Sequence, residues 1–170
     1  MKTLYVLRHA KSSWENNELA DFDRPLNDRG KTAAPFVGEI MKANRFEPQL
    51  ILASPAVRAR ETARLVKDSA GLSAEIKHNE RIYEASTLTL RNIAASIDDR
   101  FDSAMLVGHN PGIEGFVRSL TGKSEPMPTA ALAVIDLDIS GWEQISDVPG
   151  KLRRVIRPKD EKKNLGASGG

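Results

Sequence analysis

The feature that most constrains this sequence is a repeated order of apolar run, polar loop and helical pattern. Short apolar runs at residues 2–7, 50–53 and 104–107 each end abruptly at polar residues, as buried strands do. The latter two runs lead through a proline into helical patterns at 56–69 and 112–121, because the first helical turn tolerates proline. Strands that alternate with helices predict an α/β protein, a three-layer α/β/α sandwich around a mostly parallel sheet.

Further segments complete the predicted sheet and its helices. Residues 27–41 and 87–97 have helical patterns. The apolar run at 130–137 predicts another strand. Residues 142–146 and 152–156 predict a terminal hairpin across a Pro-Gly turn. We therefore expect a mixed sheet.

Length and composition fit one domain followed by a tail. The chain has 170 residues, of which 40% are hydrophobic and 28% are charged, enough for a single core. We assign residues 1–158 to this domain and residues 159–170 to a flexible, basic and Gly-rich tail. Residues 151–170 hold 7 Lys or Arg and 2 Asp or Glu but no aromatic residue. Nucleic-acid binding is therefore not expected.

Cysteine usage and apolar run lengths bear on location. The chain has no cysteine, so disulfides and thiolate metal sites are impossible. Arg8 breaks the first apolar run before it reaches the length of a signal-peptide core. No later run approaches the roughly 20 residues that cross a bilayer. We expect a cytoplasmic protein that is not embedded in a membrane.

Arginines and histidines follow three of the predicted strands. Arg8 and His9 follow the first strand, Arg58 lies just beyond the second, and His109 follows the third. The carboxyl ends of parallel strands meet at one edge of a sheet, where ligands bind. We therefore expect these four side chains to share one small volume.

This set of side chains suits a small dianion. Arginine presents paired donors that match a phosphate group, and helix N-termini add positive dipole ends. A neutral His9 could attack phosphorus while the arginines stabilise charge on the oxygens, and neighbouring cations lower its pKa toward that neutral form. A metal site would need carboxylates or closely spaced histidines, and neither His-x-His nor His-Glu-x-x-His occurs. We expect phosphoryl transfer without a metal or another cofactor.

Three motifs resemble those of the histidine phosphatase superfamily, which has the phosphoglycerate mutase-like fold. Residues 7–14 (LRHAKSSW) are similar to its Arg-His-Gly signature, residues 54–63 (SPAVRARETA) to its second motif, and residues 107–112 (VGHNPG) to its third. The motifs occur in family order. With Ala10 in place of glycine and DRPLNDRG at 23–30, they look most like the small SixA-type phosphohistidine phosphatases.

The resemblance implies roles for the four strand-end residues. It implies a three-layer α/β/α fold in which His9 is the nucleophile that forms a covalent phosphohistidine. Arg8, Arg58 and His109 would hold the phosphate, with His109 as the second catalytic histidine of the pocket. The implied enzyme is a metal-independent histidine phosphatase.

The proton donor stays open between three possibilities. Residues 79–83 (NERIY) resemble the stretch that holds the acid in the mutase branch, which makes Glu80 the first candidate and Glu84 the second. The third possibility is that no residue acts as the acid. A leaving nitrogen that already carries a proton needs less acid catalysis than an alkoxide does.

Chain length also bears on the substrate. Only 28 residues separate Glu80 from His109, and a helix and a strand use most of them, so we expect no lid and an open pocket. Its rim would include Lys11, Ser12 and Arg24.

An open site admits phosphohistidine on a protein, which is our first hypothesis, and it also admits small phosphoesters. A phosphate-binding module without turnover is a third hypothesis, which the intact histidines and arginines disfavour. We expect a monomer, since a small enzyme with an open site needs no second subunit.

Overall fold

A six-stranded mixed sheet forms the middle of the molecule. The computed structural model describes the backbone of residues 1–169 and the side chains of residues 1–165. The strands lie in the order β3-β2-β4-β1-β5-β6: the first four are parallel, β5 is antiparallel to β1, and β6 is antiparallel to β5. Their bounds are β1 (Lys2–Arg8), β2 (Leu50–Ala53), β3 (Glu75–His78), β4 (Ser103–Gly108), β5 (Leu132–Leu137) and β6 (Lys151–Ile156).

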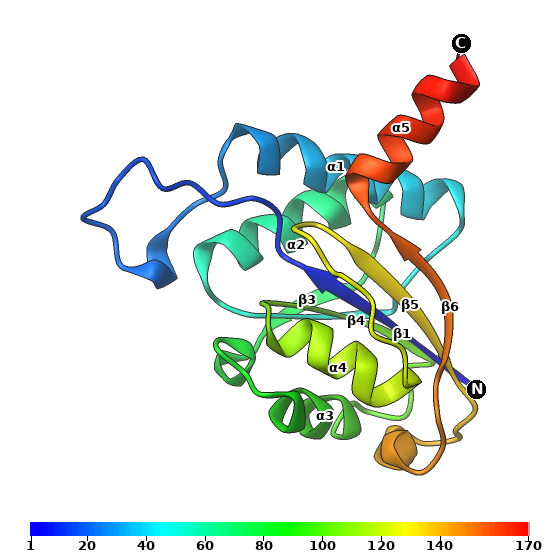
Figure 1. Ribbon diagram of the computed structural model, residues 1–170. Coiled ribbons are helices and arrows are strands. Elements are labelled where there is room, and N and C mark those ends of the chain that lie inside the picture. The colour runs from blue at the N-terminus through cyan, green and yellow to red at the C-terminus, as the bar shows by residue number, and fades with distance from the viewer. Residues whose placement is uncertain (170) are drawn as a thin grey trace.

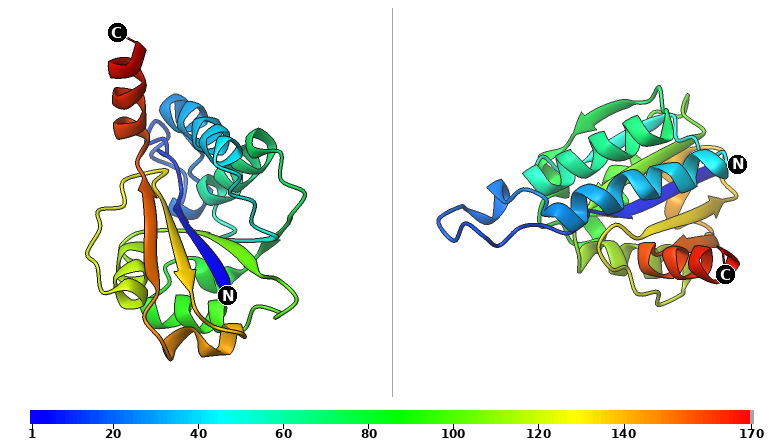
Figure 2. Two further views of the ribbon diagram at one scale, coloured as in Figure 1. Left: turned by 90° about the vertical axis from the view of Figure 1, so that its right-hand side faces the viewer. Right: turned by 90° about the horizontal axis from the view of Figure 1, so that it is seen from above.

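Helices cover both faces of this sheet, which confirms the predicted three-layer α/β/α fold (Figure 1). α1 (Asp28–Ala43) and α2 (Val57–Ala70) lie side by side on one face (Figure 2). α3 (Thr87–Ala95) and α4 (Gly112–Thr121) cover the other face. The remaining elements are the short 3₁₀ helices η1 (Asp21–Asp23), η2 (Glu80–Ile82) and η3 (Trp142–Ser146) and the terminal helix α5 (Pro158–Gly169). Within the described residues, no helix combines the length and the apolar character needed to cross a membrane.

Strand β1 is buried on both sides, which explains its continuous apolar sequence. Leu4 and Val6 belong to the core beneath α3 and α4, whereas Tyr5 and Leu7 belong to the core beneath α1 and α2. Each fully buried side chain of this size contributes about 1.5–3 kcal/mol. These two cores fix the position of β1, whose last residue is Arg8.

The predicted helices begin where their local signals indicate. The Asn27 side chain accepts a hydrogen bond from the Gly30 N–H at 2.9 Å, and the Ser86 hydroxyl accepts one from the Thr89 N–H at 3.2 Å. These contacts cap α1 and α3, because the first N–H groups of a helix lack partners within it. α2 ends at Gly71, whose φ of 68° is the left-handed conformation that glycine adopts easily.

The prediction of a strand at residues 142–146 was wrong. Residues Trp142–Ser146 form η3, whereas β6 is a strand and pairs antiparallel with β5. The Trp142 backbone N–H donates to Asp99 Oδ1 and its indole Nε1–H donates to the Phe101 carbonyl, both at 2.8 Å. Burying the indole with both donors satisfied favours this compact turn over an extended strand.

The segment that sequence analysis assigned to a flexible tail is helical in the structure, and its flexibility stays a prediction. α5 spans Pro158–Gly169 and covers the predicted tail at 159–170 except residue 170, which lies outside the described backbone. Pro158 opens the helix, and Asp160 and Glu161 lie in its first turn, where negative charge interacts favourably with the helix dipole. The boundary between the domain and this segment stays a prediction.

Candidate active site

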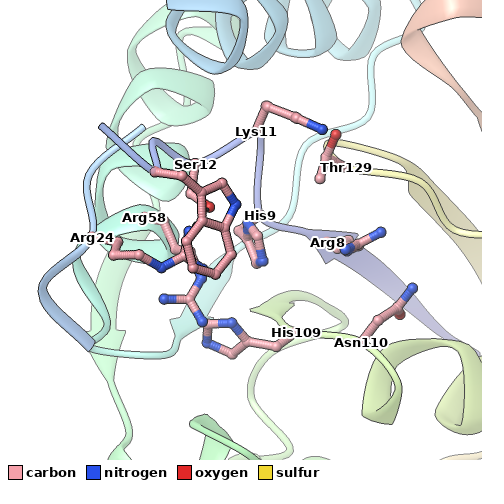
Figure 3. Close-up of a pocket in the computed structure, with 10 residues that line it drawn as sticks. Arg8, His9, Lys11, Ser12, Arg24, Arg58, His109, Asn110 and Thr129 are labelled. Atoms are coloured by element: carbon pink, nitrogen blue, oxygen red, sulfur yellow. Dashed lines mark hydrogen bonds between the residues drawn. The ribbon is translucent and has the colours of Figure 1, made fainter. Parts of the chain in front are cut away.

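The loops after β1, β2 and β4 meet beyond the carboxyl ends of these strands and form a pocket (Figure 3). Its volume is about 260 Å³. The structure brings together the four residues that sequence analysis placed at this edge, and the three expected rim residues also contribute. The lining residues are Arg8, His9, Lys11, Ser12, Trp14, Arg24, Arg58, His109, Asn110 and Thr129.

Backbone pairing around the end of β1 holds Arg8 and His9 in place. The His9 N–H donates to the Gly108 carbonyl at 3.0 Å, and the Ala130 N–H donates to both the Arg8 and His9 carbonyls at 3.1 and 3.0 Å. The Arg8 guanidinium donates through Nη1 to the Met127 carbonyl at 3.1 Å. The end of β4 and the segment that precedes β5 therefore position these two residues.

His9 is a neutral imidazole with an unprotonated Nε2. The residue is 7% exposed, and its Nδ1 lies 2.7 Å from the Ala10 carbonyl oxygen. Because a carbonyl only accepts, Nδ1 carries the hydrogen and Nε2 keeps its lone pair. Burial is the main cause that lowers the pKa of His9 to about 3, and the positive charges of Arg58, Arg8 and, in acid, a protonated His109 act in the same direction. The nitrogen available for attack on an electrophile is thus Nε2.

Arg58 extends from the first turn of α2 and is held by the loop that precedes α1. Its Nη1 donates to the Asp21 carbonyl at 2.7 Å and its Nη2 donates to Asp21 Oδ2 at 3.0 Å. Arg24 donates through Nε and Nη2 to Asp21 Oδ1, and the Tyr83 hydroxyl donates to Oδ2 at 2.6 Å. The hydrogen bond from Tyr83, with those from the arginines, holds the pKa of Asp21 well below its usual range. Asp21 therefore stays ionised and fixes both guanidinium groups.

His109 is positioned by the loop after β2. Its Nε2 lies 2.8 Å from the Ser54 hydroxyl, which also accepts a hydrogen bond from the Ala56 N–H at 3.2 Å. Ser54 is fully buried, so its single hydrogen needs an acceptor, and His109 Nε2 is in reach. The hydrogen of His109 then resides on Nδ1. Burial, with the charges of Arg58 and Arg8, lowers the pKa of His109 to about 4, so the ring is neutral.

The electrostatics of the pocket favour an anion. Four of its lining residues are Lys or Arg, and none of the described lining residues is acidic. Arg8 Nε, Arg58 Nε and His109 Nδ1 are buried nitrogens without a hydrogen-bond partner among the described residues. Buried polar groups usually have partners, and these three nitrogens belong to residues that line a cationic pocket, which favours a ligand that supplies acceptors. A phosphate dianion fits this arrangement.

The candidate acids do not join this pocket. Glu80 begins η2 and Glu84 follows it, and both side chains are exposed and absent from the lining. No group of three or more His, Asp or Glu side chains that could hold a metal ion occurs among the described residues. Sequence reasoning also missed Asp21 and Tyr83. Their only signal was a carboxylate in the loop before α1 and the tyrosine of the NERIY stretch.

Family comparison agrees with this geometry. The model of the histidine phosphatase superfamily (branch 1) matches residues 4–112, which include the loops after β1, β2 and β4. The chain belongs to the histidine phosphatase superfamily. As a histidine phosphatase it is an enzyme of phosphate-ester or phosphoramidate hydrolysis, and its matched segment contains Arg8, His9, Arg58 and His109.

Similar proteins place this histidine phosphatase near the SixA group. An uncharacterised chloroplast protein of Arabidopsis thaliana is 30% identical, covering 92% of this chain and 78% of that protein. The phosphohistidine phosphatase SixA of Escherichia coli is 27% identical over 81% of this chain and 87% of its own. The crystal structure of an Agrobacterium tumefaciens protein assigned as the phosphohistidine phosphatase SixA superposes with a TM-score of 0.80 at 29% identity, over 92% of this chain and 99% of that chain.

Proposed function

We propose that this histidine phosphatase removes phosphoryl groups from phosphohistidine on proteins, without a metal, through a covalent phosphohistidine at His9. The observation that carries the proposal is the unprotonated Nε2 of His9 in a pocket lined by arginines. A neutral nitrogen nucleophile beside cationic donors is the combination that phosphoryl transfer needs.

In the first step, His9 Nε2 attacks phosphorus. The P–Nε2 bond forms as the bond from phosphorus to the substrate nitrogen breaks, and the electron pair of that bond stays on the leaving nitrogen. Arg8, Arg58 and the Nδ1–H of His109 donate to the phosphoryl oxygens, because these three residues line the pocket and each has a buried nitrogen without a partner. A substrate imidazole protonated on its other nitrogen leaves as a neutral ring.

In the second step, water attacks the phosphorus of the His9 adduct. The P–Nε2 bond breaks, its electron pair returns to Nε2, and both hydrogens of the water leave on dihydrogen phosphate. The Nδ1–H that donates to the Ala10 carbonyl at 2.7 Å remains in place throughout. His9 is therefore restored in its original neutral form, ready for another turnover.

The lining of the pocket favours a nitrogen leaving group. Because none of the described lining residues is acidic, a substrate whose ring already carries a proton and leaves as a neutral imidazole reacts more readily than one that leaves as an alkoxide. Phosphohistidine meets this condition. The similarity to SixA of Escherichia coli supports the same substrate class.

The test measures phosphate release from a phosphohistidine-bearing protein and from p-nitrophenyl phosphate, with chelator present. Wild type is compared with His9→Ala and with His78→Ala, a matched control because His78 is exposed and lies outside the pocket. We expect release by wild type and by His78→Ala and a loss of at least about 10³-fold in His9→Ala. A radiolabelled phosphoenzyme should form in wild type and in His78→Ala, and not in His9→Ala.

The other outcomes separate the competing functions. A higher kcat/KM for p-nitrophenyl phosphate than for phosphohistidine would favour small phosphoesters as substrates. Phosphate binding without turnover of either compound would favour a non-catalytic module. Turnover that survives in His9→Ala would refute the assignment of the nucleophile.

A further inference from the structure

Trp14 is an exposed tryptophan at the mouth of the pocket. It lines the pocket, yet 70% of the residue is exposed to solvent. Tryptophan is highly buried in most folds, because its large apolar ring contributes most when it is removed from water. Contacts within the protein therefore leave most of this side chain free to meet a ligand at the mouth of the pocket.

A rigid support holds the indole of Trp14. The guanidinium carbon of Arg24 lies 3.5 Å from the centroid of the indole ring, and Arg24 itself is only 7% exposed. Arg24 donates through Nε and Nη2 to Asp21 at 3.2 and 3.1 Å, and through Nη1 to the Ser12 hydroxyl at 2.8 Å. Its hydrogen-bonding edges are thus used within the protein, and its face carries the indole.

We propose that Trp14, supported by Arg24, is the leaving-group subsite of the pocket and selects planar rings. One face of the indole lies on Arg24. Much of the ring that Arg24 does not cover is therefore open to a leaving group that projects from the phosphorus. An aromatic ring stacks favourably on indole, whereas a flexible alkyl chain gains less from the same surface. This inference rests on the proposed function for the position of the phosphorus, and it names the imidazole ring of phosphohistidine as the occupant.

Other exposed apolar residues of the same loop distinguish this subsite from a general protein-docking surface. Leu19 and Phe22 are 38% and 37% exposed, and neither lines the pocket. Phe22 packs edge-on against Tyr83 with ring centroids 5.2 Å apart. A docking surface would depend on all three side chains, whereas a leaving-group subsite depends on Trp14 alone.

The experiment compares substrates that differ in the shape of the leaving group. For each enzyme we take the ratio of kcat/KM for p-nitrophenyl phosphate to that for glycerol phosphate, and the ratio for phosphohistidine to that for phospholysine. Trp14→Ala should lower both ratios by about three- to tenfold, the effect of one lost aromatic contact. Trp14→Phe, which keeps a planar ring, should retain most of each ratio. Leu19→Ala should leave both ratios as in wild type.

A second measurement needs no turnover, so it separates failure of this inference from failure of the proposed function. Calorimetry gives the affinities of phenylphosphonate and methylphosphonate for wild type and each variant. Wild type should prefer phenylphosphonate by about three- to tenfold, and Trp14→Ala should lose that preference. Equal affinities in wild type, or a preference that persists in Trp14→Ala, would overturn the subsite. A loss of the ratios in Leu19→Ala as large as in Trp14→Ala would instead indicate a docking surface.

Discussion

Replacing Ser54 with alanine should weaken both the fold and the pocket, because the Ser54 hydroxyl fixes the orientation and tautomer of His109. In the native protein the hydroxyl lies 2.8 Å from His109 Nε2 and accepts from the Ala56 N–H. The alanine variant leaves both of these groups without a partner in a site where Ser54 is fully buried. Each unsatisfied buried group costs about 1–3 kcal/mol, so we expect the free energy of unfolding to fall by about 2–6 kcal/mol.

The effect on catalysis follows from the tautomer. A hydrogen bond that favours the Nδ1–H form by about 1–2 kcal/mol keeps His109 in the state that donates to a phosphoryl oxygen. Without it, both tautomers are populated, and kcat/KM should fall by roughly two- to fivefold. This is less than the loss of about 10²–10³-fold expected when a donor to the transition state is removed altogether, as in His109→Ala.

Three measurements check this reasoning. Urea unfolding compares Ser54→Ala with Ser119→Ala, a control that removes a hydroxyl bonded to a helix carbonyl outside the pocket. Nitrogen NMR of the three histidines should show Nδ1–H for His109 in wild type and a mixture of tautomers in Ser54→Ala. In a His109→Ala background, Ser54→Ala should have little further effect on kcat/KM. An undiminished further loss, or a protonated Nε2 in wild-type His109, would refute the argument.

Three other perturbations test the same structure. The pKa values of His9 and His109 are lowered from 6.5 to about 3 and 4, so the folded state binds fewer protons than the unfolded state in acid. The stabilisation is complete above about pH 6.5, and below it the free energy of unfolding falls by up to about 1.4 kcal/mol per pH unit for each histidine. Urea unfolding at several pH values should show a weaker dependence of stability on pH in His109→Gln, and an unchanged dependence would count against burial as the cause. Gly30→Ala places a methyl group 2.2 Å from the Lys11 carbonyl oxygen. We expect the free energy of unfolding, measured in urea, to fall by about 1–3 kcal/mol, and kcat/KM to fall as the loop after β1 shifts. An unchanged stability would contradict the close packing. Inorganic phosphate at 100 times its Kd should stabilise wild type by about 2.7 kcal/mol in thermal unfolding, and Arg58→Ala should show much less stabilisation at that concentration; an equal gain would place the anion elsewhere.

The strands and the grouping of site residues were predictable because their signals are local. A strand covered on both faces must be apolar throughout, so the sequence around Leu4 and Val6 revealed β1, and the rule for parallel sheets then brought Arg8, His9 and His109 together. β3 (Glu75–His78) lacked such a signal. It lies at the edge of the sheet and exposes most of its polar residues.

The contacts that orient the site were not predictable, since they depend on how distant segments pack. Asp21 meets Arg58 across 37 residues and Tyr83 across 62 residues. Neither separation has a periodicity or a motif that indicates contact. The same applies to Trp142, whose two hydrogen bonds reach Asp99 and Phe101 and decide that the segment turns rather than extends.

The central place of β1 has a consequence for synthesis of the chain on the ribosome. β1 pairs with β4 and β5, and Leu4 lies opposite Ala104 and Ile135. At about 5–20 residues per second, the roughly 100 residues between β1 and β4 take about 5–20 s to translate. During that interval the apolar strand and the adjoining His9 have neither neighbour. Arg8 and His9 are therefore held in place only after β5 has emerged, so we expect nascent chains that end before β5 to lack phosphatase activity.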